Sequence, residues 1–291
     1  MPNPILNDKQ FEEARSGWAA PQSPSPGGAV WPAPGQPGGP TGPTGTGVPM
    51  SDGPVTPWRP GMMTVRGSIT ATAVLFVLLL ASAVVGWMNT SPATTNPQTG
   101  ETDISFPGLA LVGVIVGFAC VIGVYFRPKL AKILGPIYAI AEGFFVGAIS
   151  RVFEEQWSGI VLQAAGATLA VFAVMLLLYN TKIIKVTDKF RRTVIFATLG
   201  IMVLYLVSFV ISLFGGTVPF INDASLIGIG FSVLVCVIAA MNLALDFDFI
   251  DRGSKAGLSK DYEWVAAVGL LVTIVWLYLE ILRLLAKLRS N

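Results

Sequence analysis

Four acidic residues lie inside or at the ends of long apolar runs of the chain: Glu142, Asp246, Asp248 and Glu280. A carboxylate at membrane depth is costly, by roughly 2.5–3.5 kcal/mol on insertion scales. Such an acid therefore normally faces protein or water, and its default interpretation is an ion or proton pathway. The first hypothesis is that these four acids, with the nearby Asn242, line such a pathway.

The spacing of these residues limits which of them can act together. Asn242 and Asp246 are four residues apart and share one helix face. Asp248 is turned about 200° away from Asp246, so only one of the two can point along the Asn242 face. A pairing or a shared water cavity between Glu142 and Asp246 is sterically open. Because Ca²⁺ takes six to eight oxygen ligands, Asp246, Glu142, Asn242 and water could form a weak transit site for it.

The alternative is purely structural. Each acid would then be neutralised, either by protonation or by a basic side chain, and would only fix how the helices pack. Arg127, Lys129 and Lys132 are candidate partners for the first three acids, and Arg283 is a candidate partner for Glu280.

Composition places the chain among membrane proteins. Apolar residues make up 53% and charged residues only 12%, whereas a soluble domain carries about 25% charged residues. The net charge of +2 and the lack of a long basic run argue against nucleic acid as a partner. The chain has no His, which removes the usual metal ligand and the usual pH switch. Its two cysteines lie in apolar segments, so neither a firm metal site nor a cofactor is expected.

The chain divides into two regions. Residues 1–65 contain most of the 20 prolines and cannot bury enough apolar surface to offset the entropy of ordering. They are predicted to form a disordered tail, or alternatively a docking segment for a partner. Residues 66–291 repeat apolar blocks long enough to span about 30 Å as helices. The prediction is an all-α membrane protein, a seven-transmembrane helix bundle with spans at about 68–89, 106–126, 133–153, 159–179, 192–214, 225–249 and 264–286.

Small residues recur at helical spacing in two of the predicted spans. Gly113 and Gly117 are four residues apart, as are Gly143 and Gly147. Such pairs let helix backbones approach closely in membranes, so they favour a packed bundle without indicating a function.

The distribution of Lys and Arg predicts the orientation. Basic residues gather before the first span and in the second, fourth and sixth connections, whereas the alternate connections hold only Arg151. This pattern places the tail in the cytoplasm. Arg283, Lys287 and Arg289 would then lie outside, against the pattern. Either the last span is a true exception or it is short or re-entrant; seven full spans are favoured.

Three short motifs carry a resemblance to a known family. They are Ala141-Glu-Gly-Phe-Phe-Val-Gly147, Asp246-Phe-Asp248 with Ile250, and Lys260-Asp-Tyr-Glu-Trp264. Residues 65–291 resemble the Bax inhibitor family, and the tail is similar to that of YccA-related members from high-GC Gram-positive bacteria. The resemblance implies helices around a central seventh one, a bacterial cytoplasmic membrane location, and a pH-sensitive calcium leak. It also implies a possible membrane-protease partner, because some bacterial members engage such proteases.

One departure from the family pattern concerns its pH-sensing pair of Asp residues. Asp246 matches the first, but alignment on Asp261-Tyr-Glu-Trp264 puts Val272 at the second position. Glu280 lies eight residues further on, about 12 Å along the helix, and is a poor replacement by depth. A two-Asp calcium gate therefore does not carry over directly. Any pH response is expected to depend chiefly on Asp246, with help from Glu142.

Catalysis is not expected. The chain has no zinc-protease, phosphate-loop or Gly-x-Ser-x-Gly motif. An intramembrane aspartyl protease needs two acids on facing helices, which Asp246 and Glu142 satisfy only formally, and the family it resembles shows no such activity. Two functions from different classes stay open: a leak pathway for cations or protons, and a non-conducting membrane regulator that binds protein partners.

Overall fold

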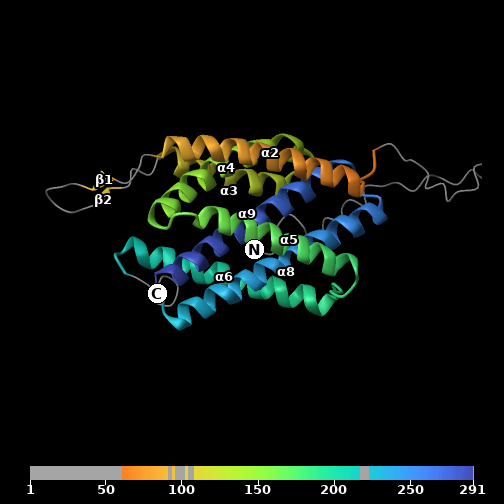
Figure 1. The fold of residues 1–291 in the computed structure, drawn as a ribbon. Helices are drawn as coiled ribbons and strands as arrows, with labels where there is room; N and C mark the ends of the chain where they lie inside the picture. The colour runs from red at the N-terminus through yellow and green to blue at the C-terminus, as the bar shows by residue number, and fades with distance from the viewer. Residues whose placement is uncertain (1–60, 91–93, 96–101, 104–107, 217–222, 291) are drawn as a thin grey trace, which may run out of the picture.

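The computed structural model describes residues 61–90, 94–95, 102–103, 108–216 and 223–290. The predicted tail lies outside the described residues up to residue 60. The remaining structure is a helical membrane bundle (Figure 1).

The seven predicted spans are confirmed. Seven described helices are long and apolar enough to cross a membrane. A short 3₁₀ turn, η1 (Pro128–Leu130), precedes α4, and two-residue strands, β1 (Thr94–Thr95) and β2 (Thr102–Asp103), pair between α2 and α3. The helices are α2 (Val65–Asn89), α3 (Gly108–Phe126), α4 (Ala131–Gln156), α5 (Ile160–Asn180), α6 (Asp188–Leu213), α8 (Leu226–Ala256) and α9 (Asp261–Arg289).

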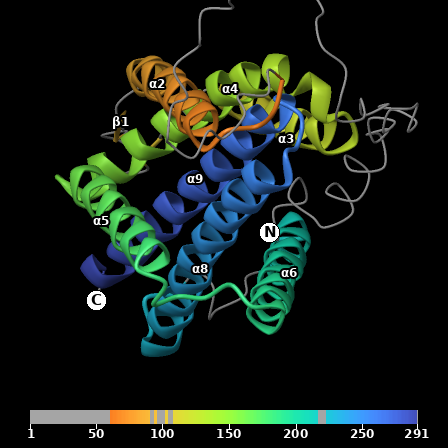
Figure 2. The ribbon, with the colours of Figure 1, turned by 90° about the vertical axis from the view of Figure 1, so that its right-hand side faces the viewer.

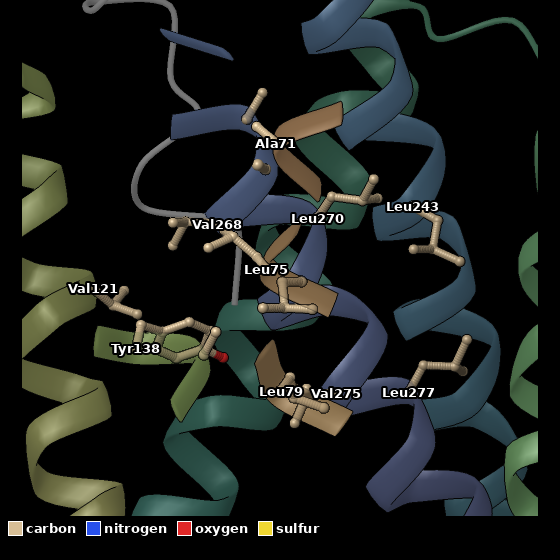
Figure 3. Packing of buried hydrophobic residues seen from close by; sticks show 14 of the residues in the cluster. Ala71, Leu75, Leu79, Val121, Tyr138, Leu243, Val268, Leu270, Val275 and Leu277 are labelled. Atoms are coloured by element: carbon tan, nitrogen blue, oxygen red, sulfur yellow. The ribbon is translucent and has the colours of Figure 1, made fainter. Parts of the chain in front are cut away.

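The last helix, α9, is the centre of the bundle, as predicted. It packs against α8, α2, α4 and α5, which surround it in Figures 1 and 2. In its most apolar stretch 78% of residues are buried, against at most 44% in any other spanning helix. Figure 3 shows Val268 and Val275 of α9 on the side of Leu75 and Leu79 of α2, and Leu277 of α9 on the side of Leu243 of α8. With 29 residues, α9 is about 43 Å long, so it is a full span rather than a re-entrant segment.

Close backbone contact joins α2 to α4. A Cβ atom added to Gly143 or Gly147 of α4 would overlap the main-chain carbonyl of Leu79 or Ala83 on α2. Gly86 of α2 faces the α4 backbone in the same way. The predicted small-residue pair on this span therefore acts as expected, because only glycine permits this separation between the two helices.

We call the end of the bundle where α2 begins the tail end, and the opposite end the far end. At the tail end, the chain just before α2 is fastened to the turn between α8 and α9. The Met63 amide donates to the Leu258 carbonyl at 2.7 Å. The buried Glu263 of α9 accepts from the Thr64 amide at 2.9 Å and from the Thr64 hydroxyl at 2.8 Å. Gly257 closes α8 in the left-handed region, with φ of 69°, which glycine adopts without strain.

The three basic residues near the C-terminus lie at the far end and are engaged within the bundle. Lys287 is buried and donates to the Gly228 carbonyl at 3.0 Å and the Ser232 hydroxyl at 2.9 Å. Arg289 donates to the Ser158 carbonyl at 2.8 Å. Arg283 pairs with Glu280 on its own helix. Lys and Arg in the connections were expected on the cytoplasmic side. These three side chains instead bond groups of the bundle, which is a physical reason for them to lie at the other end.

Candidate functional site

A cavity of about 300 Å³ lies between α4, α6 and α9. Its wall is mostly apolar, and its polar groups are Glu142 and Tyr138 from α4, Thr198 and Tyr205 from α6, and Thr273 from α9. The cavity sits where α6 stands away from the central helix, since α6 has its backbone contacts mainly with α8. Figure 2 shows α6 separated from α2, α4 and α5.

One face of α6 supplies a whole wall of this cavity. Thr198, Ile201, Met202 and Tyr205 all line it, and their spacing of three, four and seven residues is that of a single helix face. Thr198 and Tyr205 were not among the site residues expected from the sequence. Their signal was available: two hydrogen-bonding side chains seven residues apart on an otherwise apolar span.

Glu142 projects from the middle of α4 into the space between helices. Its side chain is half-buried, and its Oε2 atom would lie 2.8 Å from a Cβ on Gly117 of α3. The glycine at 117 therefore leaves room for the carboxylate. In the predicted pair of Gly113 and Gly117, Gly117 thus makes room for the Glu142 side chain, whereas Gly113 faces the α4 backbone.

Asn242 connects this cavity to Asp246. The Asn242 side-chain amide donates to the Thr198 hydroxyl at 2.9 Å and to the Ile238 carbonyl at 2.9 Å. Asp246 follows one helical turn later on the same face of α8, and both residues are almost fully buried, at 3% and 2% exposure. Asp246 is not on the cavity wall. Asn242 therefore bonds the cavity residue Thr198, and Asp246 lies one turn beyond it on α8, outside the cavity lining.

Asp248 belongs to an ion cluster at the tail end. Its Oδ2 atom lies 3.0 Å from the Arg191 guanidinium of α6 and 2.8 Å from Nε of Arg252 on α8. This carboxylate holds the start of α6 against the end of α8, and its direction differs from that of Asp246, as two positions along a helix require. The ion pairs of Asp248 are thus with Arg191 and Arg252. The partners predicted from the sequence, Arg127, Lys129 and Lys132, have exposed side chains.

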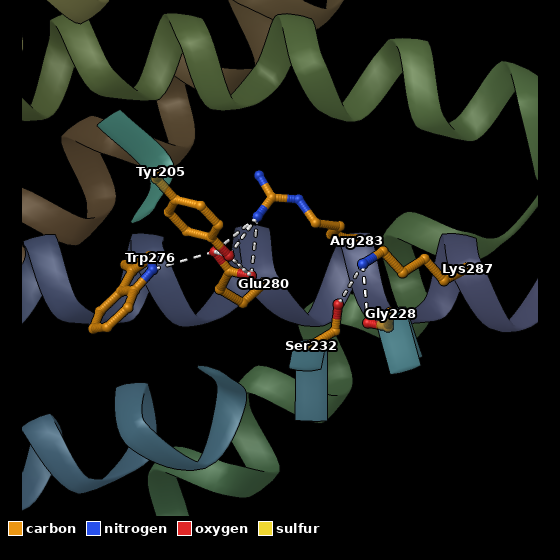
Figure 4. A network of polar contacts seen from close by, with 7 residues as sticks. All are labelled: Tyr205, Gly228, Ser232, Trp276, Glu280, Arg283 and Lys287. Atoms are coloured by element: carbon orange, nitrogen blue, oxygen red, sulfur yellow. Dashed lines mark hydrogen bonds and ion pairs between the residues drawn. The ribbon is translucent and has the colours of Figure 1, made fainter. Parts of the chain in front are cut away.

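Glu280 is held in a polar network at the far end of the cavity (Figure 4). The Tyr205 hydroxyl lies 3.0 Å from both carboxylate oxygens, Arg283 Nη1 donates to them at 3.1 and 3.2 Å, and Trp276 Nε1 donates at 3.3 Å. Arg283 also donates to the Tyr205 hydroxyl at 2.8 Å. The carboxylate thus ties α9 to α6, and the ion pair with Arg283 is the one considered from the sequence.

With this geometry established, comparison with known families gives one finding. A family model described as Bax inhibitor 1 like matches residues 3–290. The chain belongs to the Bax inhibitor 1 like family. The match covers nearly the whole chain, including the Pro/Gly-rich tail, where the resemblance read from the sequence was placed on residues 65–291. The comparison with curated proteins gives no match.

Within this Bax inhibitor 1 like bundle, the position of Val272 bears on the missing second Asp. Val272 lines the same cavity as Glu142. The acid on this cavity wall is therefore contributed by α4, while the α9 position is apolar. Glu142 and Val272 thus line the same cavity from two helices. The acid is on α4, whereas the family pattern would place it on α9.

The described residues do not contain a group of three or more His, Cys, Asp or Glu side chains that could hold a metal ion. Glu142 and Asp246 lie on different helices, and Asp246 is outside the lining of the Glu142 cavity. Each carboxylate in this arrangement could bind or release a proton, or serve as one oxygen ligand of a hydrated cation.

Proposed function

We propose that this Bax inhibitor 1 like protein is a pH-sensitive leak pathway for cations in the bacterial cytoplasmic membrane, with its tail in the cytoplasm. The observation that carries the proposal is an arrangement of polar groups on three spanning helices. Glu142 and Thr198 line one cavity, and Asn242 bonds Thr198. Asp246 lies one helical turn from Asn242 on the same face of α8. Buried acids in spanning helices are rare and usually belong to ion or proton pathways. The tail end also carries the basic residues expected of a cytoplasmic face.

The small number of oxygen ligands on this path favours weak, transient binding of a cation over a resident metal ion. Ca²⁺ requires six to eight oxygen ligands, and the pathway offers two separate carboxylates, the Asn242 amide and the Thr198 hydroxyl group. Conduction requires sites weak enough to release the ion. Protons need only one group at a time, so protons and Ca²⁺ are the two candidate ions, and their relative flux is a direct experimental question.

Flux measurements in proteoliposomes test this proposal. Loss of about 1.4 kcal/mol of cation stabilisation corresponds to about a tenfold slower flux, so we expect Asp246→Asn and Glu142→Gln each to slow the leak by at least about that factor. The flux change between about pH 5 and 8 should disappear in Asp246→Asn. The matched control is Asp251→Asn, on the same helix, where the Asp side chain is 38% exposed and pairs with Lys255.

Calcium and proton indicators enclosed in the vesicles distinguish the ion. A pH-dependent leak that persists in the Asp246→Asn, Glu142→Gln double variant would contradict the proposal, and so would an equal loss in the Asp251→Asn control.

The second candidate is a non-conducting regulator that binds a membrane protein, such as a protease, through its tail and bundle. The observation favouring it is the attachment of residues 61–64 to the α8–α9 turn, by which a partner held on the tail could pull on the two helices that carry Asp246 and Glu263. The family match, which extends to residue 3, also includes the tail.

Removal of residues 1–60 separates the two candidates. A leak pathway should keep its flux in proteoliposomes, because residues 61–290 contain every group of the proposed path. A regulator should lose its partner in co-purification from membranes. If the truncated chain keeps its partners and shows no flux, both candidates fail.

A further inference from the structure

A second hollow lies on a different face of α9. It is an apolar groove of about 680 Å³ formed by α2, α4, α5 and α9. Ile274 and Tyr278 of α9 line this groove, whereas Trp276 lines the Glu142 cavity. Since residues two apart on a helix point about 200° away from each other, the groove and the cavity open on different sides of the central helix, with Val275 between them.

The walls of the groove offer almost nothing for water to bind. The three hydroxyl groups among its lining residues are already bonded. Ser150 and Tyr278 form a hydrogen bond of 2.6 Å with each other, and the Thr168 hydroxyl donates to the Ala164 carbonyl at 2.7 Å. The groove lies along four spanning helices, at the depth of the hydrocarbon. A hydrocarbon chain is therefore the occupant that leaves no polar group unsatisfied.

The far end of the groove has a polar mouth. Trp87, on the last turns of α2, lines the groove there, and the Arg151 guanidinium of α4 lies 5.3 Å above the centre of its ring. Arg151 Nε pairs with Glu155 at 2.8 Å, and the arginine side chain keeps 31% exposure. Tryptophan settles at the headgroup level of membranes, and arginine is the side chain best suited to bind a phosphate group.

We propose that the groove binds one acyl chain of a bilayer glycerophospholipid, with the lipid phosphate held by Arg151 beside Trp87. The apolar walls and bonded hydroxyl groups match the acyl chain, and the arginine at the mouth matches the phosphate headgroup. The site is independent of the proposed leak pathway, because it shares only Val275 with the lining of the Glu142 cavity.

Native mass spectrometry of the full chain, titrated with phosphatidylglycerol and with the phosphate-free diacylglycerol, tests both parts of the site. Ala165 lines the groove, and Ala165→Phe should reduce binding of both lipids about tenfold or more, since 1.4 kcal/mol is tenfold. Ala170→Phe is the matched control, because Ala170 is on the same helix with its side chain exposed; it should leave binding unchanged.

The second arm removes the charge. Wild type should prefer phosphatidylglycerol over diacylglycerol, Arg151→Gln should abolish that preference while keeping diacylglycerol binding, and Arg151→Lys should restore part of it. This arm stands even if Ala165→Phe does not fold. Equal effects of Ala165→Phe and Ala170→Phe would overturn the proposal, as they indicate surface lipid only. A dimer that forms through the groove, or lipid binding that appears only after removal of residues 1–60, would also overturn it by naming another occupant.

Discussion

Gly147→Ala is expected to destabilise the bundle strongly, although it adds one methyl group. The new Cβ would overlap the Ala83 carbonyl oxygen of α2. Because that oxygen belongs to a helix backbone, a rotamer change cannot relieve the overlap and the two helices must separate. Overpacking of a tight core costs about 1–3 kcal/mol and occasionally more, and we expect the upper part of that range. The loss of unfolding free energy is measured by titrating the protein in mixed micelles with a denaturing detergent and following its unfolding.

The control for this variant is Gly166→Ala on α5. A Cβ at Gly166 meets nothing within 4 Å, and alanine is the better helix former by up to about 1 kcal/mol. That variant should be neutral or slightly stabilising. If both substitutions give the same unfolding midpoint, α2 and α4 do not pack in this register.

The fold was predictable from sequence because its signals are local. Each span is an uninterrupted apolar block of membrane length, and the block from Val265 to Leu285 is apolar around most of its circumference, as a central helix must be. Gly143 and Gly147 also indicated a close approach. All of these signals can be read within a single helix, without knowledge of which helices are in contact.

The candidate site was only partly predictable, because its contacts join segments far apart in the chain. Asp246 and Asn242 stood out as polar residues one turn apart in an apolar run. Thr198, 44 residues before Asn242, bonds Asn242 and lines the Glu142 cavity, and this contact depends on how α6 packs against α8. Asp248 pairs with Arg191, 57 residues away, and with Arg252 on its own helix. Neither arginine was among the partners expected from the sequence, which were the basic residues at 127, 129 and 132.

Charge patterning also reached its limit at the C-terminus. The rule that places Lys and Arg in the cytoplasm concerns residues in the connections. Lys287 instead bonds the start of α8, and Arg283 bonds a carboxylate on its own helix. A sequence gives the charge of such a residue but not its burial, and burial decides whether it counts toward orientation.

Arg283→Met should cause the second large loss of stability. Glu280 is 2% exposed, and without Arg283 its charge would be left with the hydroxyl of Tyr205 and the indole N–H of Trp276. Breaking a buried pair by removing one partner costs about 3–5 kcal/mol. Since the Arg283 side chain is 40% exposed, solvent screening reduces this, and we expect about 2–3 kcal/mol.

The comparison with Lys255→Met shows why burial, not distance, sets this order. The Lys255–Asp251 pair is shorter, at 2.6 Å against 3.1 Å, but its side chains are 72% and 38% exposed. Exposed pairs contribute about 0–1 kcal/mol, so Lys255→Met should hardly move the unfolding midpoint. Glu280→Gln removes the buried charge and keeps an acceptor for Tyr205, so in that background Arg283→Met should lose much of its effect. An undiminished effect in the double variant would mean that Arg283 stabilises the bundle by packing over the Tyr205 ring, 5.1 Å away, and not by pairing with Glu280.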